Sequence, residues 1–204
     1  MKHNLSIHSL RKMLSNMPMP IEEIKKKLDD FRCRKDKDIE NFLRFEAIKY
    51  ERTGKARTYL ITDDANGVLI GYFTLSINSI TFDKGIDSKV KKILDYEADR
   101  KQFKYMKKPF VPAILLALFG KDDNKFKEYL LQVEEIGVKR LSDIVFPAIF
   151  KIARQVSNVI GGQVIYLDCE KDKKLIKFYE NFNFTHFRNN EYDKNLTQMM
   201  RVIN

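Results

Sequence analysis

The stretch that decides the fold is Gln163-Val-Ile-Tyr-Leu-Asp-Cys169, followed closely by Lys174-Leu-Ile-Lys-Phe-Tyr-Glu-Asn-Phe-Asn-Phe184. The first segment is apolar at successive positions, as a strand buried on both faces is. In the second segment the apolar residues recur at helical spacing. Asp172 stands just before them, where a carboxylate can accept hydrogen bonds from the first backbone N–H groups of a helix. The pattern predicts a buried strand over 163–169 and a helix over 172–182.

The segments on either side of this pair continue the alternation. Residues 184–188 and 197–203 predict a closing hairpin around the polar loop 189–195. Upstream, apolar residues from Leu141 to Val156 trace one helix face, and Gly161-Gly162 ends that helix. Pro147 should kink this helix or mark its true start.

The centre of the chain contains a second buried strand. Phe110 to Phe119 is apolar on both faces, and Gly120 should end the strand. Residues 124–135 could form a helical loop after it.

The front half predicts helices followed by a strand hairpin. Residues 21–28 form a short basic helix candidate, and Phe31-Arg32-Cys33 resembles a short strand. Apolar positions at helical spacing then begin near Asp36. Strands are expected over 57–62 and 68–76, joined by a turn that ends in Asn66-Gly67. The apolar positions of the helix are Ile39, Phe42, Leu43, Ala47 and Tyr50.

This order predicts an α/β (α+β) domain with three layers. We expect one central mixed sheet, largely antiparallel, with helices on both faces. Residues 1–27 are interpreted as an N-terminal arm or short helix, with weak order expected over 1–20, and residues 28–204 as the domain itself.

Composition limits the classes of protein. The 204 residues are 44% hydrophobic with few Gly and Pro, which is enough for a core and excludes collagen-like or Pro/Gly-rich disordered chains. Lys and Arg number 38 against 28 Asp and Glu, so the net charge is +10. A basic field of that size attracts polyanions such as RNA, DNA and nucleotides. A lysine-rich surface that only confers solubility would give the same charge.

Cysteine and histidine usage indicates a reducing compartment and no metal. The two cysteines, Cys33 and Cys169, do not make a disulfide framework. The three histidines match no metal-ligand spacing. No apolar run is long enough to span a membrane, and charges interrupt the N-terminus before it could act as a signal peptide. We therefore expect a cytoplasmic protein without membrane attachment.

A basic segment interrupts the strand order. Nine Lys and Arg residues lie between 84 and 108, on a long connection between two strands. Long connections often carry function. The segment could face a polyanion, or it could be a solvated run of charge.

The quoted strand and helix resemble the end of the GNAT acyltransferase fold, in which a strand is followed by a helix with a Phe-Tyr…Phe signature. Gly usually precedes the last Phe, and Asn183 stands there in this chain, at a position that could need a positive φ. The front half, including Gly71-Tyr-Phe-Thr-Leu-Ser76, is similar to a GNAT subgroup. That subgroup includes bacterial toxins that acetylate aminoacyl-tRNA and stand-alone acetyltransferases.

The resemblance implies an acetyl-coenzyme A site on the central strand and on a phosphate loop. The strand's backbone would contact pantetheine, and its N–H groups would stabilise the oxyanion. The phosphate loop normally has two glycines before a helix, but only one is present in Gln132-Val-Glu-Glu-Ile-Gly137. Lys139 and Arg140 could supply positive charge instead. The implied cofactor-binding residues are Leu118, Phe119, Gly120, Lys121, Gly137, Val138, Lys139, Arg140 and Leu141.

The resemblance also implies a proton donor. Tyr179 would protonate the leaving thiolate, whereas core packing is its alternative role. No general base is assigned. Cys169 has no histidine partner that would make it a nucleophile. The candidates for a base are Glu46, Asp95, Glu97 and His186.

The expected activity is transfer of an acetyl group from acetyl-coenzyme A to a primary amine by direct attack. The acceptor could be aminoacyl-tRNA bound through the basic 84–108 segment, a protein amine or a small amine. An antitoxin-like partner could mask the same face, and a homodimer is left open. The alternative is a non-catalytic GNAT-fold protein that binds coenzyme A or RNA.

Overall fold

The computed structural model describes residues 4–16, 19–81, 92, 110–132, 140–190 and 192–203. The chain divides into two compact units. Unit 1 comprises Met1–Ser76 and Leu116–Val145, and unit 2 comprises Ile77–Leu115 and Phe146–Asn204. Three elements run through both units, namely β3 (Leu69–Thr81), β4 (Phe110–Lys121) and α8 (Leu141–Ile160).

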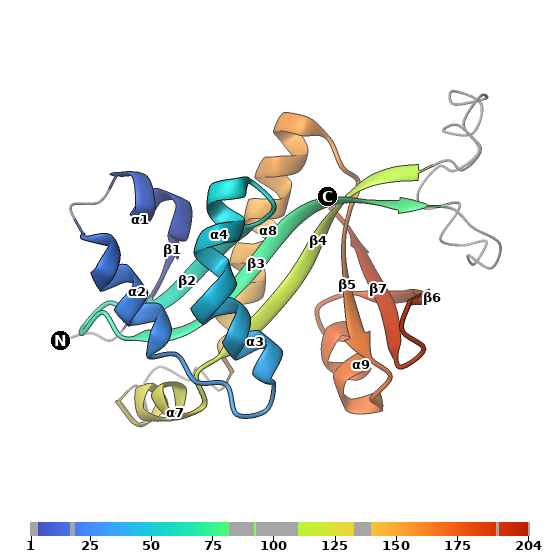
Figure 1. Cartoon of the computed structure of the whole chain (residues 1–204). Helices are drawn as coiled ribbons and strands as arrows, with labels where there is room; N and C mark the ends of the chain where they lie inside the picture. The colour runs from blue at the N-terminus through green and yellow to red at the C-terminus, as the bar shows by residue number, and fades with distance from the viewer. Residues whose placement is uncertain are drawn as a thin grey trace. The chain divides into compact units, whose positions relative to one another are not determined.

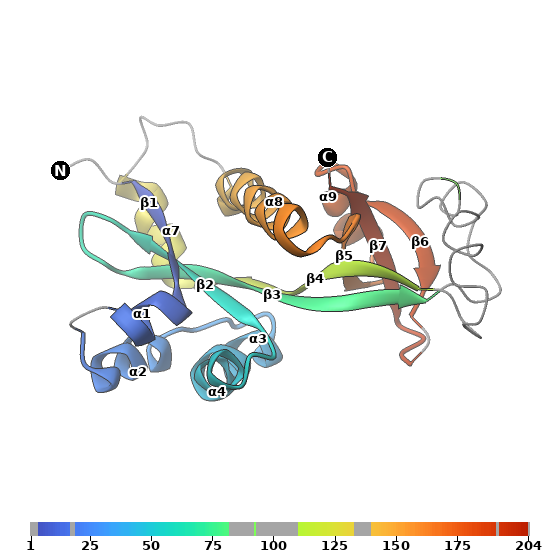
Figure 2. The same cartoon turned by 90° about the horizontal axis from the view of Figure 1, so that it is seen from above.

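Unit 1 combines a meander of strands with short helices. Figure 2 shows α1, α2, α3 and α4 on one side of β2 and β3, and α7 on the other side. A π-helical turn, η1, connects α3 to α4 without a break in the helix. The elements wholly within unit 1 are β1 (Leu5–Ser9), α1 (Leu10–Asn16), α2 (Ile21–Asp29), α3 (Lys37–Asn41), η1 (Phe42–Glu46), α4 (Ala47–Thr53), β2 (Arg57–Asp63) and α7 (Asp123–Gln132).

Unit 2 contains the segment that first indicated the fold. The strand and helix predicted over 163–182 are confirmed, and the closing hairpin follows them (Figure 1). The elements wholly within unit 2 are β5 (Val164–Glu170), α9 (Lys173–Glu180), β6 (Thr185–Asn189) and β7 (Leu196–Val202).

The strands form one mixed sheet in the order β1-β2-β3-β4-β5-β7-β6. The pairs β1·β2, β2·β3, β5·β7 and β6·β7 are antiparallel, whereas β4 and β5 are parallel. The parallel pair follows from the long connection through α8, since parallel neighbours need a crossover. The predicted sheet, mixed and largely antiparallel, is therefore confirmed.

Aspartate side chains cap the first turns of two helices. Asp36 Oδ1 accepts the N–H groups of Asp38 and Ile39 at 2.9 and 3.2 Å, and so begins α3. Asp172 caps α9 in the same way, as predicted. The helix α8 begins at Leu141 and contains Pro147 in its interior, so Pro147 does not mark its start.

Each unit has its own apolar core. In unit 1 the helices α1 and α2 and the turn η1 bury their apolar faces against β2 and β3. The core residues there are Leu10, Met13, Ile24, Leu28, Phe31, Cys33, Leu43, Ala47, Leu60, Leu69 and Tyr72. In unit 2 the sheet contributes Ile80, Val111, Ala113, Val164, Tyr166, Phe187 and Met200.

The N-terminal segment is more structured than its sequence predicts. Strand β1 pairs with β2 from Leu5↔Asp63 to Ser9↔Tyr59. The buried residues Leu10 and Ile24 join the core of unit 1, and the packing of Leu10 contradicts the weak order expected for the described part of 1–20. Helix α2 crosses the expected boundary between residues 27 and 28, and that domain division stays a prediction.

The expected strand at Phe31-Arg32-Cys33 is wrong. These residues form no ladder, because the Phe31 N–H donates to the Leu28 carbonyl at 3.1 Å and the next two N–H groups bind side-chain carboxylates. The Arg32 N–H donates to Asp122 Oδ2 at 2.9 Å, and the Cys33 N–H donates to Glu40 Oε2 at 2.9 Å. A backbone satisfied in this way needs no partner strand.

No helix in the described ranges is both long enough and apolar enough to cross a bilayer.

Candidate active site

The end of β4 holds four of the residues expected to bind the cofactor. Leu118 is half-buried and packs against the core of unit 1, Phe119 is half-buried, and Gly120 is buried. Lys121 is exposed, and its Nζ lies 4.8 Å from the centre of the Phe126 ring. The lysine is therefore held over an aromatic face at the point where the strand ends.

Close backbone packing brings the end of β4 against the start of α8. A Cβ atom on Gly71 of β3 would lie 2.7 Å from the Gly120 carbonyl oxygen and 2.9 Å from Leu141 Cδ2. A Cβ atom on Gly120 would lie 2.3 Å from Ile39 Cγ2. Real Cβ atoms do not approach neighbours so closely, so this packing requires glycine at both positions. The structure thus brings together Gly120 and Leu141, which the sequence placed in one site.

The expected phosphate loop is only partly described. Gly137, Val138 and Lys139 lie outside the described residues. Arg140 is exposed just before α8, and its carbonyl accepts the N–H of Asp143 at 3.2 Å. Leu141 is buried in the core, so any contact with a cofactor there would be made by its backbone. Asp143 places a carboxylate in the first turn of α8, a position that the helix dipole favours for a negative charge.

Tyr179 lies in an aromatic cluster of unit 2. Its ring meets Phe146, Phe178 and Phe184 edge to face, with centroids 6.2, 5.0 and 5.9 Å away. The ring is half-buried, and its hydroxyl makes no hydrogen bond to a described residue. The tyrosine is therefore packed and at the same time has an unused donor, so the two roles considered from the sequence do not exclude each other.

Burial raises the pKa of Tyr179 above its ordinary value, and the nearby Cys169 contributes in the same direction. The phenol therefore stays protonated throughout the neutral pH range. A protonated phenol can donate to a thiolate, whereas a phenolate could not.

The same environment argues against a nucleophilic cysteine. Cys169 is buried on β5, and burial raises the pKa of its thiol to about 11. Cys33 is also buried, and burial raises its pKa too. Because the thiolate is the reactive species, both cysteines are unreactive at neutral pH.

The parallel ladder between β4 and β5 is short. It pairs Ala113 with Val164, Ile114 with Ile165 and Leu115 with Tyr166. Strand β5 continues to Glu170, paired on its other side with β7 as far as Glu170↔Leu196. Asp168 is thus the first residue beyond the ladder that faces the same side of β5 as Tyr166.

A polar row on this side of unit 2 was not found from the sequence. Asp168 on β5 lies opposite Gln198 on β7, which lies opposite Arg188 on β6. Asp168 Oδ1 accepts from Gln198 Nε2 at 2.8 Å, and Arg188 Nε donates to Gln198 Oε1 at 2.5 Å. A register irregularity between His186 and Arg188 sets this alignment. Sequence alone gives no signal for it, because the register cannot be known beforehand.

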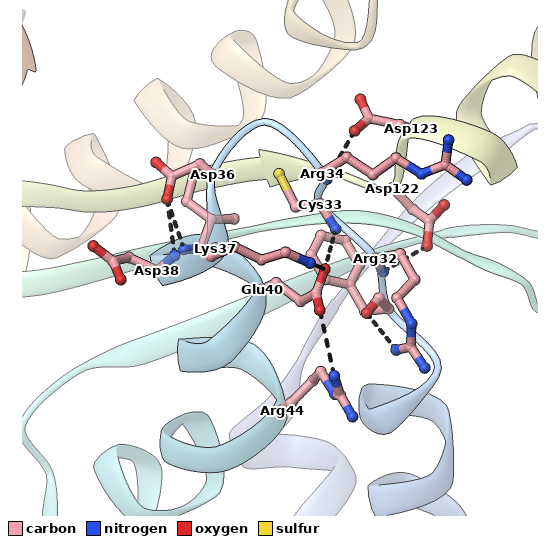
Figure 3. A network of polar contacts seen from close by, with 12 residues as sticks. Arg32, Cys33, Arg34, Asp36, Lys37, Asp38, Glu40, Arg44, Asp122 and Asp123 are labelled. Carbon is pink, nitrogen blue, oxygen red and sulfur yellow. Dashed lines mark hydrogen bonds and ion pairs between the residues drawn. The ribbon is translucent and has the colours of Figure 1, made fainter.

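A second polar network pins the loop before α3 to the end of β4 (Figure 3). The Arg34 N–H donates to Asp123 Oδ2 at 3.0 Å, next to the Arg32–Asp122 contact described above. Glu40 also accepts from Lys37 and Arg44, and the Cys33 N–H together with Lys37 lowers the pKa of its carboxyl. The network fixes the loop, and its two buried carboxylates, Asp122 and Glu40, are taken up by these contacts.

The proposed bases do not form a site. Glu46 is half-buried and pairs with Lys49 at 3.4 Å, and His186 is exposed on β6. Asp95, Glu97 and the basic 84–108 segment, apart from Lys92, lie outside the described residues. Within the described ranges, no three His, Cys, Asp or Glu residues gather as metal ligands would.

Comparison with known proteins shows the fold. No family model and no curated protein matches the chain. Among solved structures, AtaT complexed with acetyl-methionyl-tRNAfMet is 14% identical, with 98% of this chain and 95% of that chain covered and a TM-score of 0.62. A tyrosine-to-phenylalanine mutant of KacT is 14% identical over the same shares, with a TM-score of 0.61.

A further match is a tyrosine-to-phenylalanine mutant of the toxin AtaT, bound to the C-terminus of the antitoxin AtaR and to acetyl-CoA. It is 16% identical, covers 98% of this chain and 94% of that chain, and has a TM-score of 0.56. Such identities establish common architecture and leave activity to be argued from residues. The resemblance drawn from the Phe-Tyr…Phe helix is thereby confirmed at the level of architecture, and the chain has the GNAT-like fold of the AtaT and KacT toxins.

Proposed function

We propose that this chain transfers an acetyl group from acetyl-coenzyme A to a primary amine. The observation that carries the proposal is the state of Tyr179. Its phenol is held by three aromatic rings, stays protonated at neutral pH, and keeps its hydroxyl free of hydrogen bonds to the described residues. These are the properties that a proton donor to a thiolate needs.

The reaction is a direct attack. The amine nitrogen forms a bond to the thioester carbon, and the carbon–sulfur bond breaks. The nitrogen loses a proton to water, and Tyr179 gives its proton to the departing sulfur and regains one from water. Backbone N–H groups near Leu118–Gly120 are the proposed donors to the oxyanion. Neither cysteine is needed, in accordance with their raised pKa values.

The cofactor site is proposed at the end of β4 and the start of α8. The contact of Gly71 with Gly120 and Leu141 holds these segments together, and the exposed Arg140 side chain supplies positive charge to the phosphates. Gly137, Val138 and Lys139 would complete the loop. AtaT, which shares the fold, has been solved with acetyl-CoA, and this supports the choice of donor.

For the acceptor we propose the α-amine of an aminoacyl-tRNA. The net charge of +10 favours a polyanion, and AtaT has been solved with acetyl-methionyl-tRNAfMet. The basic 84–108 segment is the proposed contact surface. AtaT has also been solved with the antitoxin AtaR, so an antitoxin-like partner for this chain belongs to the same proposal.

Two measurements test the function. Calorimetric titration with acetyl-coenzyme A should show binding, and radiolabelled acetyl transfer should occur to aminoacyl-tRNA in preference to a peptide or a small amine. Binding of the tRNA should weaken steeply with salt, since phosphate contacts release counterions. Binding of coenzyme A or tRNA without any transfer would instead support the non-catalytic alternative. Absence of acetyl-coenzyme A binding would remove the enzyme hypothesis.

A further inference from the structure

The carboxylate of Asp168 is exposed and yet held in one orientation. Its Oδ1 accepts two amide donors, Gln198 Nε2 at 2.8 Å and Asn190 Nδ2 at 2.7 Å. Its Oδ2 makes no hydrogen bond or ion pair with a described residue. One oxygen therefore has two donors, and the other stays available on an exposed side chain for a further donor.

The donors themselves are fixed by a further contact. Arg188 Nε donates to Gln198 Oε1 at 2.5 Å, and Arg188 Nη1 donates to the Thr81 carbonyl at 2.9 Å. A guanidinium can only donate, so it holds the oxygen of the Gln198 amide and turns the amide NH2 toward Asp168. Gln198 is buried, which keeps this arrangement rigid. Such a carboxylate, fixed by residues behind it, is what a binding site for a small cation requires.

Asp168 and Tyr179 lie on opposite sides of strand β5. Adjacent residues of a strand point to opposite faces. Cys169 is buried and is near enough to raise the pKa of Tyr179, whereas its neighbour Asp168 is exposed, so the two side chains lie on opposite faces of β5. Asp168 also lies just past Leu115↔Tyr166, the last pair of the β4–β5 ladder. An acyl donor at this end of the ladder would have Tyr179 on one side of β5 and Asp168 on the other.

We propose that Asp168 binds the amino group of the acceptor and takes up its proton, an assignment that rests on the proposed acetyl transfer. Asp168 Oδ2 accepts a hydrogen bond from the amine while Oδ1 stays on Gln198 and Asn190. As the nitrogen–carbon bond forms and the carbon–sulfur bond breaks, the proton of the amine passes to the carboxylate and on to water. Tyr179 supplies the proton that the sulfur takes and recovers one from water. The acid and the base thus act from opposite faces of one strand.

The test uses Asp168→Asn with Glu170→Gln as its matched control. The asparagine side chain of the first variant keeps a carbonyl oxygen that accepts from Gln198 and Asn190, so the row stays intact and only the charged oxygen is lost. Glu170 is exposed on the same face of the same strand, and no hydrogen bond to a described residue holds its side chain. We expect kcat/KM for the amine to fall about 10²-fold in Asp168→Asn, with acetyl-coenzyme A affinity unchanged and Glu170→Gln close to wild type.

A second readout does not depend on catalysis. The side-chain NH2 signals of Asn190 and Gln198 in a ¹⁵N–¹H NMR spectrum report directly on Asp168. Methioninamide, a primary amine, should shift them, whereas N-acetylmethioninamide should not. In Asp168→Asn the methioninamide shift should be lost, and in Glu170→Gln it should remain.

The outcomes separate this inference from the proposed function. Wild-type transfer with an unaffected Asp168→Asn rate overturns the role of Asp168 and leaves acetyl transfer standing. If no transfer occurs but the two amide signals still respond to methioninamide in an Asp168-dependent way, amine binding stands and the enzyme hypothesis fails. If methioninamide leaves both signals in place, Asp168 is not an amine site.

Discussion

Phe182 stacks on Phe146 with ring centroids 4.1 Å apart and planes inclined by 12°. The contact fixes the end of α9 against α8 within unit 2. Tyr179 lies three residues before Phe182 and touches the same Phe146 ring with its edge. The position of the Tyr179 phenol therefore depends on an aromatic ring of α8 as well as on the residues of α9.

The first prediction concerns Tyr179→Phe. The ring and its edge contacts remain, so stability and acetyl-coenzyme A affinity should change little. Only the proton donor is lost, and the rate of acetyl transfer should fall about 10²-fold or more. Tyr192→Phe is the control. The Tyr192 side chain is 97% exposed, so this substitution should leave the rate unchanged. An unaltered rate in Tyr179→Phe would reduce Tyr179 to a packing residue.

The second prediction concerns the aromatic cluster. Phe146 is fully buried, so Phe146→Ala should lower the free energy of unfolding by about 3–5 kcal/mol. Phe45→Ala removes a ring that is 62% exposed, and the free energy of unfolding should change by less than about 0.5 kcal/mol. Urea denaturation followed by circular dichroism measures both. Equal effects for the two variants would contradict the described core.

The third prediction concerns the close approach at the end of β4. A methyl group on Gly120 would overlap Ile39 Cγ2, so Gly120→Ala should destabilise the chain by about 1–3 kcal/mol. Ile39→Ala removes the atom that causes the overlap. In a double-mutant cycle the combined variant should therefore be more stable than the sum of the single effects by about 1 kcal/mol. Strict additivity would show that the clash is absent.

The fourth prediction concerns the turn after α9. Asn183 has φ = 61°, and the Phe184 N–H returns to the Tyr179 carbonyl at 3.2 Å, as in a Schellman motif. Asn183→Gly should stabilise the chain by up to about 1 kcal/mol, because glycine adopts positive φ without cost. Asn183→Ala should destabilise it by a similar amount. Thermal unfolding of the three proteins gives the order, and an alanine variant as stable as the glycine variant would refute the account.

Much of the fold could be predicted because apolar periodicity reports directly on burial. The strands and helices of unit 2 follow the predicted segments closely, and the positive φ expected at Asn183 is confirmed. The prediction failed where side chains from other elements take up the backbone N–H groups. Arg32 and Cys33 resemble a strand locally, but Asp122 and Glu40 take their N–H groups.

The candidate site was predictable only in part. Tyr179 could be found because its helix carries a recognisable signature. Asp168 could not, because its significance depends on Gln198 and Asn190, which are brought to it by strand pairing. The phosphate-loop prediction at Gly137, Val138 and Lys139 and the basic 84–108 segment stay predictions.

The row Asp168–Gln198–Arg188 has a consequence for how the sequences of relatives should vary. Gln198 serves two neighbours at once, with its oxygen bound to Arg188 and its NH2 group bound to Asp168. A residue with only donors or only acceptors cannot replace it without leaving one neighbour unsatisfied. Positions 168, 188 and 198 should therefore be exchanged as a set and not singly, which would appear as statistical covariation once homologous sequences are aligned.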